Sequence, residues 1–289
     1  MDRLARFQAN RSRLFGLAYR LLGEAGEAED VVQEAYLRWD TDARDNVVNA
    51  EAWLTKVVTN LCLTRLTSAR ARREAYVGPW LPEPVFTDRG PLEIAEERES
   101  LSFGVLVLLE RLTPPERAAF VLREAFGYSH REIAEILDLT EANVRQLCHR
   151  ARRHVTEARK RFTATREDRR RMTERLLAAT VEGDVAALER LLADDVAAWA
   201  DGGGRVTAAR RPVLGRDKVA RYLAGLAHHP LAASVEIELR WVNGEPGLVA
   251  RTPEVLIAVM VPDPGPDGLA ALRTVLNPDK LAFAAAQQA

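Results

Sequence analysis

The chain has 289 residues, and its 47% hydrophobic and 29% charged residues are the composition of a globular protein long enough for two or three domains. It opens with no charged segment leading into an apolar one and has no apolar run of membrane-spanning length, so we expect a soluble, cytoplasmic protein without membrane contact. The formal net charge of −1 conceals a segregation, because residues 140–175 carry twelve Lys or Arg against five Asp or Glu, whereas residues 77–112 carry three against seven. A near-neutral total therefore does not exclude a protein that binds nucleic acid.

Helical periodicity predicts a first domain over residues 1–76. Apolar residues recur at intervals of three and four along three segments, which indicates three or four packed helices. The segments carry Leu14, Leu17, Ala18 and Leu21, then Ala28, Val31, Val32, Ala35 and Trp39, then Leu54, Val57, Val58 and Leu61. The second helix is acidic on its outer side, but acids near a helix N-terminus also complement the helix dipole, so this pattern alone indicates no partner.

The third helix of this domain is basic. Residues 51–76 carry five basic side chains against two acidic ones, and Lys56, Asn60 and Arg65 lie on its polar side. With Trp53 beside Lys56, the helix suits a stacking platform and phosphate track for single-stranded DNA. Alternatively, Trp53 belongs to the core, and the arginines at the helix end, including Arg73, form a solvated terminus. The pattern leaves both interpretations open.

Residues 77–100 are predicted to form a linker. Pro and Gly are too dense there for a helix or a central strand before about Leu92. Trp80 and Leu81 would be costly to leave in water, so we expect the linker to dock on another part of the protein.

Residues 101–162 contain the pattern of a helix-turn-helix. Three helix starts are marked by caps, which divide the segment into short helices. They are the capping boxes of Thr113 with Glu116 and of Ser129 with Glu132, the first followed by Pro114, and the N-cap Thr140.

The third of these helices has two distinct sides. One side gathers Val144, Leu147, Cys148, Ala151 and Val155, and the other gathers Ala142, Gln146, His149 and Arg153. Gln, His and Arg can bond base edges, and flanking arginines suit phosphates, so the second side fits a major groove. The flanking residues are Arg145, Arg150 and Arg152. A solvated face of a helical bundle is the alternative, but the capped triplet of helices favours DNA.

Residues 168–289 are predicted to form an α+β domain. Two helices are expected near 170–181 and 184–193, followed by strands with turns at 243–244 and 262–268. Alternation over 235–242 indicates a strand with one buried face, and the apolar run 255–261 indicates a central strand.

Asp201 is the candidate for acid–base chemistry in this domain, because Gly202 to Gly204 allow close backbone approach. An Asx-type bond that anchors a tight turn is the more ordinary role for such a residue. The adjacent His228 and His229 would point apart, so a metal site is not expected there. Neither Cys62 nor Cys148 has a partner at metal-ligand spacing, and we expect reduced thiols, no metal and no cofactor.

Three segments, in this order, resemble regions 2 and 4 of the extracytoplasmic-function (ECF) sigma factors of bacterial RNA polymerase. They are Asp-Val-Val-Gln-Glu-Ala-Tyr-Leu-Arg-Trp at 30–39, Ala-Trp-Leu-Thr-Lys-Val-Val-Thr-Asn-Leu-Cys at 52–62, and the helix-turn-helix at 113–153. In that family the acidic helix docks on the clamp helices of the polymerase β′ subunit, and the next helix with its preceding loop holds the non-template strand of the minus-ten element. The helix-turn-helix reads the minus-thirty-five element.

The resemblance implies a role for individual residues. Core-polymerase binding is implied for Asp30, Gln33 and Glu34. Binding of the minus-ten element is implied for the loop 41–50 and for Trp53, Lys56, Asn60 and Arg65. Binding of the minus-thirty-five element is implied for Arg145, Gln146, His149, Arg150 and Arg153.

Trp-Leu-Pro-Glu-Pro at 80–84 resembles the linker signature of a sigma-factor subgroup with an extra C-terminal domain, and Asp-Gly-Gly-Gly-Arg at 201–205 and Asn-Pro-Asp-Lys-Leu at 277–281 strengthen the likeness. Arg205 stands where the subgroup usually has Lys. The resemblance implies two all-α domains followed by an α+β SnoaL-like cone-shaped barrel, which contacts the linker and regulates sigma activity. The residues implied in this contact are Trp80, Leu81, Pro82, Asp201, Gly202, Gly203, Arg205, Asn277, Pro278, Asp279 and Lys280.

The expected function is therefore that of a sigma factor, not an enzyme, with core polymerase and promoter DNA as partners. Two other functions stay open. One is a one-component regulator whose barrel senses a small ligand, although it leaves residues 12–76 without a role. The other is a barrel with isomerase or cyclase activity that uses Asp201 as its base.

Overall fold

The computed structural model describes residues 3–41, 49–88, 102–158 and 164–288, which fall into two compact units. The helical unit contains the described residues of 3–75 and 105–158, and the sheet unit contains those of 76–88, 102–104 and 164–288. None of the helices in these ranges combines the length and the apolar character that a bilayer crossing requires.

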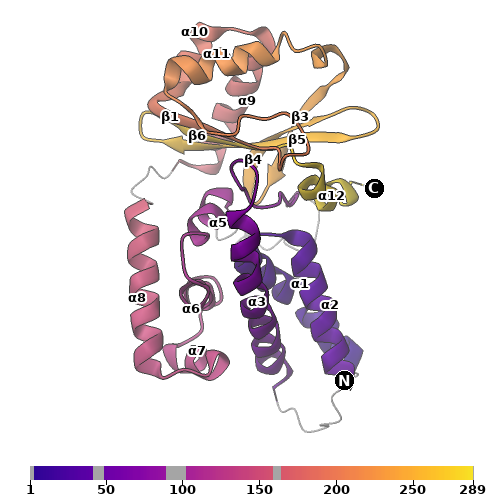
Figure 1. The fold of residues 1–289 in the computed structure, drawn as a ribbon, viewed down its shortest axis with the longest axis vertical. Coiled ribbons are helices and arrows are strands. Elements are labelled where there is room, and N and C mark those ends of the chain that lie inside the picture. Colours follow the sequence, from indigo (N-terminus) through magenta and orange to yellow (C-terminus); the bar gives the residue numbers. More distant parts are fainter. Residues whose placement is uncertain (1–2, 42–48, 89–101, 159–163, 289) are drawn as a thin grey trace. The chain divides into compact units, whose positions relative to one another are not determined.

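The helical unit begins with three helices, shown in indigo and violet in Figure 1. They are α1 (Arg3–Leu22), α2 (Ala25–Thr41) and α3 (Ala50–Glu74). The apolar positions that carry the predicted periodicity are largely buried, including Leu14, Val31 and Leu54, so this part of the core follows the sequence pattern. Asn49 starts α3 by accepting a hydrogen bond from the Ala52 amide, which satisfies one of the free N–H groups at the helix start.

Four further helices follow. They are α5 (Phe103–Leu109), α6 (Pro114–Glu124), α7 (His130–Leu137) and α8 (Glu141–Ala158). Both predicted capping boxes are present, and the Asn143 amide donates to the Thr140 hydroxyl at the start of α8. Asp138 ends α7 in the left-handed conformation, with φ 54°, which Asp and Asn tolerate better than most residues. The helix-turn-helix prediction is confirmed in this geometry.

The sheet unit is built on one six-stranded sheet with the order β2-β1-β6-β5-β4-β3. Its strands are β1 (Leu192–Asp201), β2 (Val213–Leu214), β3 (Glu236–Val242), β4 (Glu245–Arg251), β5 (Leu256–Gly265) and β6 (Gly268–Val275). The pair β1–β6 is parallel, and the other neighbouring pairs are antiparallel. The apolar segment 255–261 is confirmed as part of a central strand, β5.

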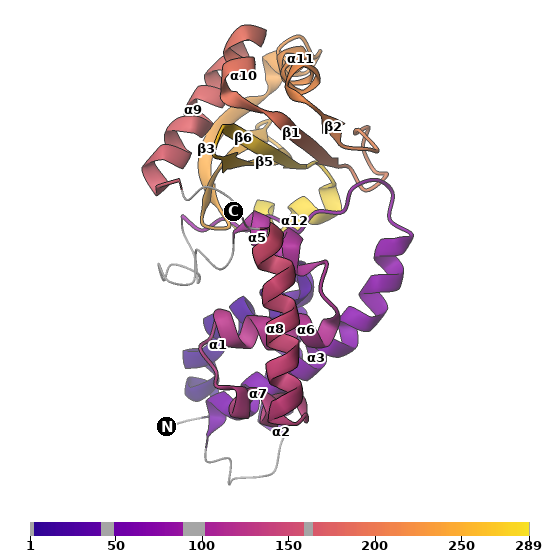
Figure 2. The same cartoon turned by 90° about the vertical axis from the view of Figure 1, so that its left-hand side faces the viewer.

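Helices cover one face of this sheet, as Figures 1 and 2 show. They are α9 (Arg166–Glu182), α10 (Val185–Leu191) and α11 (Arg216–Leu226). Leu176, Leu188 and Leu223 from these helices pack with Val196 and Leu272 from the strands in one buried cluster. The helix α12 (Pro278–Ala286) lies on the other face of the sheet (Figure 2).

The linker adds to the edge of this sheet. Phe86 forms an isolated antiparallel bridge with Val242, and the Thr87 amide donates to the Trp241 carbonyl. Gln287 donates to and accepts from the backbone of Phe86, so both polar groups of this buried residue are satisfied. The docking predicted for the linker is thus confirmed within residues 77–88.

Two local predictions in the sheet unit are wrong. Residues 262–265 were expected in a turn, but they pair with β6 as the end of β5, and the register shifts between Asp263 and Pro264. Proline is compatible with a strand at such an irregularity. The strand at 235–242 was expected to bury one face, yet β3 is an edge strand and its Ile237 is 38% exposed. The hairpin turn at Asn243 and Gly244 is confirmed, since both have positive φ.

Candidate functional site

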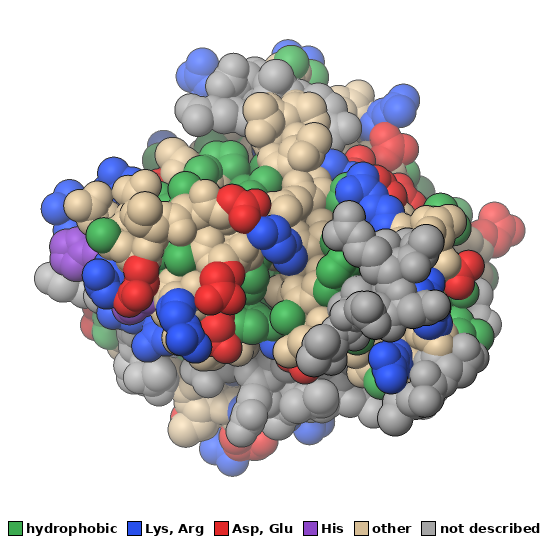
Figure 3. Space-filling view, turned by 90° about the horizontal axis from the view of Figure 1, so that it is seen from below, with side chains coloured by type: hydrophobic (Ala, Val, Ile, Leu, Met, Phe, Trp, Pro, Cys, Tyr) green, Lys and Arg blue, Asp and Glu red, His purple; other side chains and the backbone are tan. Residues whose placement is uncertain are grey.

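The DNA-reading face predicted for α8 is solvent-exposed. Val144, Cys148 and Ala151 are buried against the unit, while Gln146, His149 and Arg153 are exposed on the other side. All three flanking arginines bond acids of the same unit. Arg145 bonds Glu141 at 2.6 Å, Arg150 bonds Glu116 at 3.1 Å and Arg152 bonds Glu124 at 2.6 Å. Seen from below the view of Figure 1, basic and acidic side chains lie interspersed on the surface of the molecule (Figure 3).

The residues assigned to the minus-ten element spread along the polar side of α3. Trp53 is half-buried and packs against the buried Trp39 with ring centroids 5.4 Å apart, so it combines a core contact with partial exposure. Asn60 is exposed. Arg65 bonds Glu27 at 2.6 Å and Glu34 at 3.5 Å, two acids of α2. Most of the loop 41–50 lies outside the described residues.

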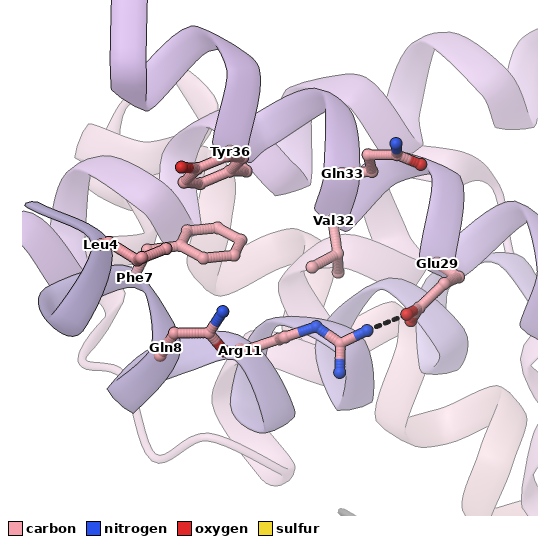
Figure 4. A pocket seen from close by; sticks show the side chains of 8 residues that line it. All are labelled: Leu4, Phe7, Gln8, Arg11, Glu29, Val32, Gln33 and Tyr36. Atoms are coloured by element: carbon pink, nitrogen blue, oxygen red, sulfur yellow. Dashed lines mark hydrogen bonds and ion pairs between the residues drawn. The ribbon is translucent and has the colours of Figure 1, made fainter.

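The residues assigned to core polymerase lie on one side of α2. Asp30 and Gln33 are exposed, and Glu34 is half-buried beside Arg38, which it bonds at 2.7 Å. Gln33 also lines a pocket of about 250 Å³ between α1 and α2, shown in Figure 4. The other lining residues are Leu4, Phe7, Gln8, Arg11, Glu29, Val32 and Tyr36, and Arg11 and Glu29 form an ion pair there.

Lys56, one of the residues assigned to DNA, contacts the helix-turn-helix in this structure. Its Nζ donates to the Glu135 carbonyl at 2.8 Å and to Asp138 Oδ1 at 2.6 Å, at the end of α7. Beside it, the Tyr128 hydroxyl lies 3.1 Å from Thr55 Oγ1 and accepts from Arg13 at 2.9 Å. The start of α3 is therefore covered by the segment around α7.

Arg73 is part of a partly buried ion network rather than a solvated helix end. It bonds Glu24 at 3.0 Å and pairs with Glu110, which also pairs with Arg117. Arg117 is 2% exposed and its Nε donates to the Arg20 carbonyl at 3.1 Å. Burial lowers the pKa of Arg117 to about 9, so the guanidinium stays charged at neutral pH. The interpretation of Arg73 as a solvated terminus is therefore wrong.

The linker is fastened to the sheet unit by a group that we name the linker latch: Tyr76, Leu81, Asp201 and Lys280. Asp201, at the end of β1, is fully buried. Its carboxylate accepts from the Tyr76 hydroxyl at 2.6 Å, from the Leu81 amide at 2.8 Å and from Lys280 Nζ at 2.7 Å. The Asx-turn interpretation of Asp201 is wrong, because its side-chain bonds go to the linker and to α12.

Aromatic rings complete the latch. Lys280 Nζ also donates to the Leu81 carbonyl at 2.5 Å and lies 4.1 Å from the centroid of the Trp80 ring. Burial, and then the hydrogen bond to Asp201, raise the pKa of Tyr76, so its hydroxyl remains a donor at neutral pH. Asn277 caps α12 and donates to the Tyr76 hydroxyl at 2.9 Å. Tyr76 was not among the predicted site residues.

The remaining residues of the implied contact differ in burial. Pro82 is buried with the linker, and Pro278 begins α12 after the Asn277 cap. Arg205 bonds Asp279 at 3.0 Å, but both side chains are about two-thirds exposed at 66% and 65%. Gly202 and Gly203 leave no room for a side chain. A Cβ on Gly202 would lie 2.8 Å from the Val206 carbonyl oxygen, and a Cβ on Gly203 would lie 2.3 Å from Asn277 Nδ2.

A second buried carboxylate, Glu245 at the start of β4, was not predicted. Its two oxygens accept from the Phe103 amide and from Arg169, both at 3.0 Å. Burial raises the pKa of Glu245 to about 7, although Arg169 acts in the opposite direction. Arg273 and Asp263, bonded at 3.2 Å, lie in the same charged cluster. No sequence signal marks Glu245, because it follows the Asn-Gly turn as an ordinary polar residue.

Among the residues that the structure describes, no three His, Cys, Asp or Glu side chains gather as metal ligands would. Cys62 and Cys148 are both buried free thiols. Burial raises the pKa of each, which leaves these thiols protonated and unreactive.

Known proteins match both parts of the helical unit. The family Sigma-70 region 2 matches residues 6–72, and the family Sigma-70, region 4 matches residues 103–155. Together these regions define the class, the sigma-70-type factors of RNA polymerase. The ECF RNA polymerase sigma factor SigJ of Mycobacterium tuberculosis is 39% identical over 295 residues, covering 96% of this chain and 92% of that protein. The chain therefore belongs to the ECF RNA polymerase sigma factors.

Further comparisons agree. A probable ECF RNA polymerase sigma factor, SigI of M. tuberculosis, is 31% identical over 259 residues and covers 89% of this chain and 87% of that protein. The crystal structure of M. tuberculosis SigJ superposes with a TM-score of 0.78 at 36% identity, covering 97% of this chain and 98% of that one. The fold of two helical sigma regions followed by an α+β domain is confirmed, and the sigma-factor function holds over the one-component regulator.

Proposed function

We propose that this sigma factor uses α2 to bind the β′ clamp helices of core polymerase, α3 to hold the minus-ten strand and α8 to read the minus-thirty-five element. The exposure of Asp30 and Gln33 on α2 and of Gln146, His149 and Arg153 on α8 supports these roles. The proposal divides the chain into four parts: sigma region 2 at residues 1–76, the linker at 77–100, sigma region 4 at 101–162 and the regulatory domain at 168–289. The protein would act in the cytoplasm, where RNA polymerase is found.

The duplex contact is tested with Arg153→Ala. Loss of a bidentate base contact should weaken binding of the upstream element by about 1–3 kcal/mol and relax discrimination at one base pair. Arg175→Ala, an exposed arginine of α9, is the matched control. Equal weakening on every sequence would make Arg153 a phosphate contact, and no weakening would remove it from the site.

We propose further that the sheet unit regulates sigma activity through the linker latch. The observation that carries this proposal is the burial of Asp201 between the linker and α12, with Tyr76, Leu81 and Lys280 all bonded to its carboxylate. Tyr76 and Leu81 tie the start of the linker to the sheet unit, so this part of the linker cannot move independently of that unit. Whatever changes the latch therefore changes the freedom of the chain that joins the two sigma regions.

Run-off transcription with core polymerase tests this regulation. Asp201→Asn should change the promoter-specific output severalfold, because it removes the charge that Lys280 faces. Asp195→Asn, an exposed position on the same strand, is the matched control and should leave the output unchanged. If both variants transcribe like the parent protein, the latch is structural and the regulatory role is wrong.

We do not propose catalysis by the sheet unit. A general base needs a free carboxylate within reach of substrate, whereas Asp201 is fully buried and engaged by three donors. The apolar face toward α9, α10 and α11 is packed with side chains such as Leu188, Leu223 and Leu272. A small ligand is therefore not needed to explain this domain.

A further inference from the structure

The loop between α6 and α7, residues 125–129, places two aromatic rings on Arg13 of α1. The Arg13 guanidinium lies 5.2 Å from the centroid of Phe126 and 5.3 Å from that of Tyr128, within the range of cation–π attraction. Arg13 also donates to the Tyr128 hydroxyl at 2.9 Å and bonds Glu51 at 2.7 Å. One guanidinium thus has two ring partners and a hydroxyl partner.

The same loop covers the first two turns of α3. Thr55 Oγ1 lies 3.1 Å from the Tyr128 hydroxyl. One residue further, Lys56 Nζ is held by the Asp138 carboxylate and the Glu135 carbonyl at the end of α7. Phe126 and Tyr128 are only partly buried, so the loop rests on the surface of α1 and α3 and is not part of the core.

The groups on α1 and α3 are those that bind single-stranded nucleic acid. Guanidinium planes stack on bases, a neighbouring hydroxyl bonds a base edge, and an ammonium pairs with phosphate. The loop and α7 present to these groups side chains that resemble the parts of a nucleotide in shape and charge. The rings of Phe126 and Tyr128 stand in for flat bases, the Tyr128 hydroxyl for a polar edge, and the Asp138 carboxylate for a phosphate.

We propose that Arg13, Thr55 and Lys56 form a binding site for one or two nucleotides of single-stranded DNA, and that Phe126, Tyr128 and Asp138 fill this site in the compact helical unit. The inference rests on the proposed role of α3 in holding the minus-ten strand, and it adds Arg13 of α1 as a direct contact. DNA and the aromatic loop then compete for the same surface, so strand capture releases α7 from α3.

Binding of a short fluorescein-labelled single-stranded DNA of random sequence to the free full-length protein tests the competition. Tyr128→Phe keeps the ring and removes the hydroxyl, and Asp138→Asn keeps a residue that tolerates the left-handed conformation while removing the charge. Each should bind the strand several-fold tighter, because the closed form is less populated. Arg13→Ala removes a partner of the loop as well as a contact for the strand, so it is added to Tyr128→Phe, and the double variant should bind the strand about tenfold more weakly than Tyr128→Phe alone.

Tyr222→Phe and Asp195→Asn in the sheet unit are matched controls for the lost hydroxyl and the lost charge, and should bind like the parent protein. A duplex of the same length separates this site from α8, because affinity for the duplex should change much less. If Tyr128→Phe and Asp138→Asn do not tighten single-strand binding, or if adding Arg13→Ala to Tyr128→Phe does not weaken it, the proposal is overturned.

Hydrogen exchange provides a readout that needs no variant. Adding the single strand should raise exchange at the amides of residues 125–129, which lose their cover when the strand enters. Unchanged or slower exchange under saturating strand would refute the competition. Run-off transcription keeps the two proposals apart. Promoter-specific transcripts with unaltered loop exchange overturn only the competition between the loop and the strand, whereas the absence of such transcripts overturns the proposed function itself.

Discussion

Asp201 and Glu245 are two buried carboxylates of the sheet unit with different electrostatic surroundings. Asp201 faces Lys280, an amide and a phenol, so each part of its charge meets a donor. Glu245 meets Arg169 and the Phe103 amide, but Asp263 of the same sign is also near, and burial dominates its pKa. Substitutions at Lys280 and at Glu245 therefore test two different effects on stability. The first removes the partner of a buried charge, and the second removes a buried carboxyl group whose protonated form burial favours.

Replacing Lys280 by Met should destabilise the sheet unit by about 3–5 kcal/mol, because the substitution leaves the Asp201 charge buried and unpaired. The side chains of the pair are 7% and 0% exposed. Hydrogen exchange of the β1 and β6 amides reports the opening free energy of this unit. Adding Asp201→Asn to Lys280→Met should recover part of the loss.

Arg205→Ala is the control for this experiment. The pair Arg205–Asp279 joins the same two segments but is mostly exposed. Its removal should change the opening free energy by less than about 1 kcal/mol. A similar loss for Lys280→Met and Arg205→Ala would contradict the assignment of the latch to the buried pair.

Glu245 should make the stability of the sheet unit depend on pH. Burial raises its pKa from the ordinary 4.5 of a glutamate to about 7, so protonation favours the folded state. This contribution is fully present below about pH 4.5 and is lost as the pH rises through about 7; its full size is about 3 kcal/mol. Glu245→Gln should lose much of the difference in opening free energy between about pH 5 and pH 8. Identical pH profiles for the two proteins would show that Glu245 does not titrate in this range.

At the scale of elements, the sequence predicts helix starts and tight turns correctly, because these depend on interactions within a few residues. The capping boxes at Thr113 and Ser129 and the Asn243–Gly244 hairpin appear where the sequence indicates them. The predictions failed where contacts between residues far apart in the sequence determine the structure. Arg73 carries the pattern of a solvated helix end, but its partner Glu110 is 37 residues away. The helix α11 and the strand β2 were not predicted at all.

The linker latch likewise contains residues that the sequence indicates and one that it does not. The resemblance named Trp80, Asp201 and Lys280, and the structure brings these residues together. Tyr76 was missed, because nothing in a helix terminus rich in arginine marks one tyrosine as the partner of a carboxylate 125 residues away. The resemblance also did not indicate that Lys280 is almost fully buried.

The loop after β1 must approach α12 closely, and this predicts an effect for Gly203→Ala. Gly203 has φ +57°, and an added Cβ would lie 2.3 Å from Asn277 Nδ2 and 2.8 Å from the Tyr76 hydroxyl. Gly215→Ala is the matched control, since it has φ +89° but open space around its Cβ. Backbone strain alone costs about 1–3 kcal/mol at either position. Hydrogen exchange of α12 should show a larger loss for Gly203→Ala, and equal losses would mean that the contact with Asn277 adjusts without cost.

At the scale of the molecule, the two sigma regions form one compact helical unit. The start of α3 is bonded to α7, and Arg73 and Arg117 share Glu110 in the partly buried network. Under the roles proposed for α3 and α8, this arrangement leaves α8 accessible to duplex DNA, while part of the α3 surface that would hold the minus-ten strand is covered by α7. If these roles are correct, initiation requires a second arrangement of the same helices, in which the ion pair between Lys56 and Asp138 is broken.

The promoter geometry predicts how far the regions must separate. Elements centred on minus-ten and minus-thirty-five are about 25 base pairs apart, or about 85 Å along B-form DNA, whereas Lys56 and Asp138 are bonded at 2.6 Å in the compact unit. Donor and acceptor dyes at Thr67→Cys on α3 and Arg131→Cys on α7, both exposed, should show high transfer efficiency in the free protein. The buried Cys62 and Cys148 leave labelling to the new thiols. Efficiency should fall when core polymerase and a promoter fragment with both elements are added, and fall less with a fragment that lacks one element. High efficiency retained in a complex that yields run-off transcript would show that one of the two elements is not bound as proposed.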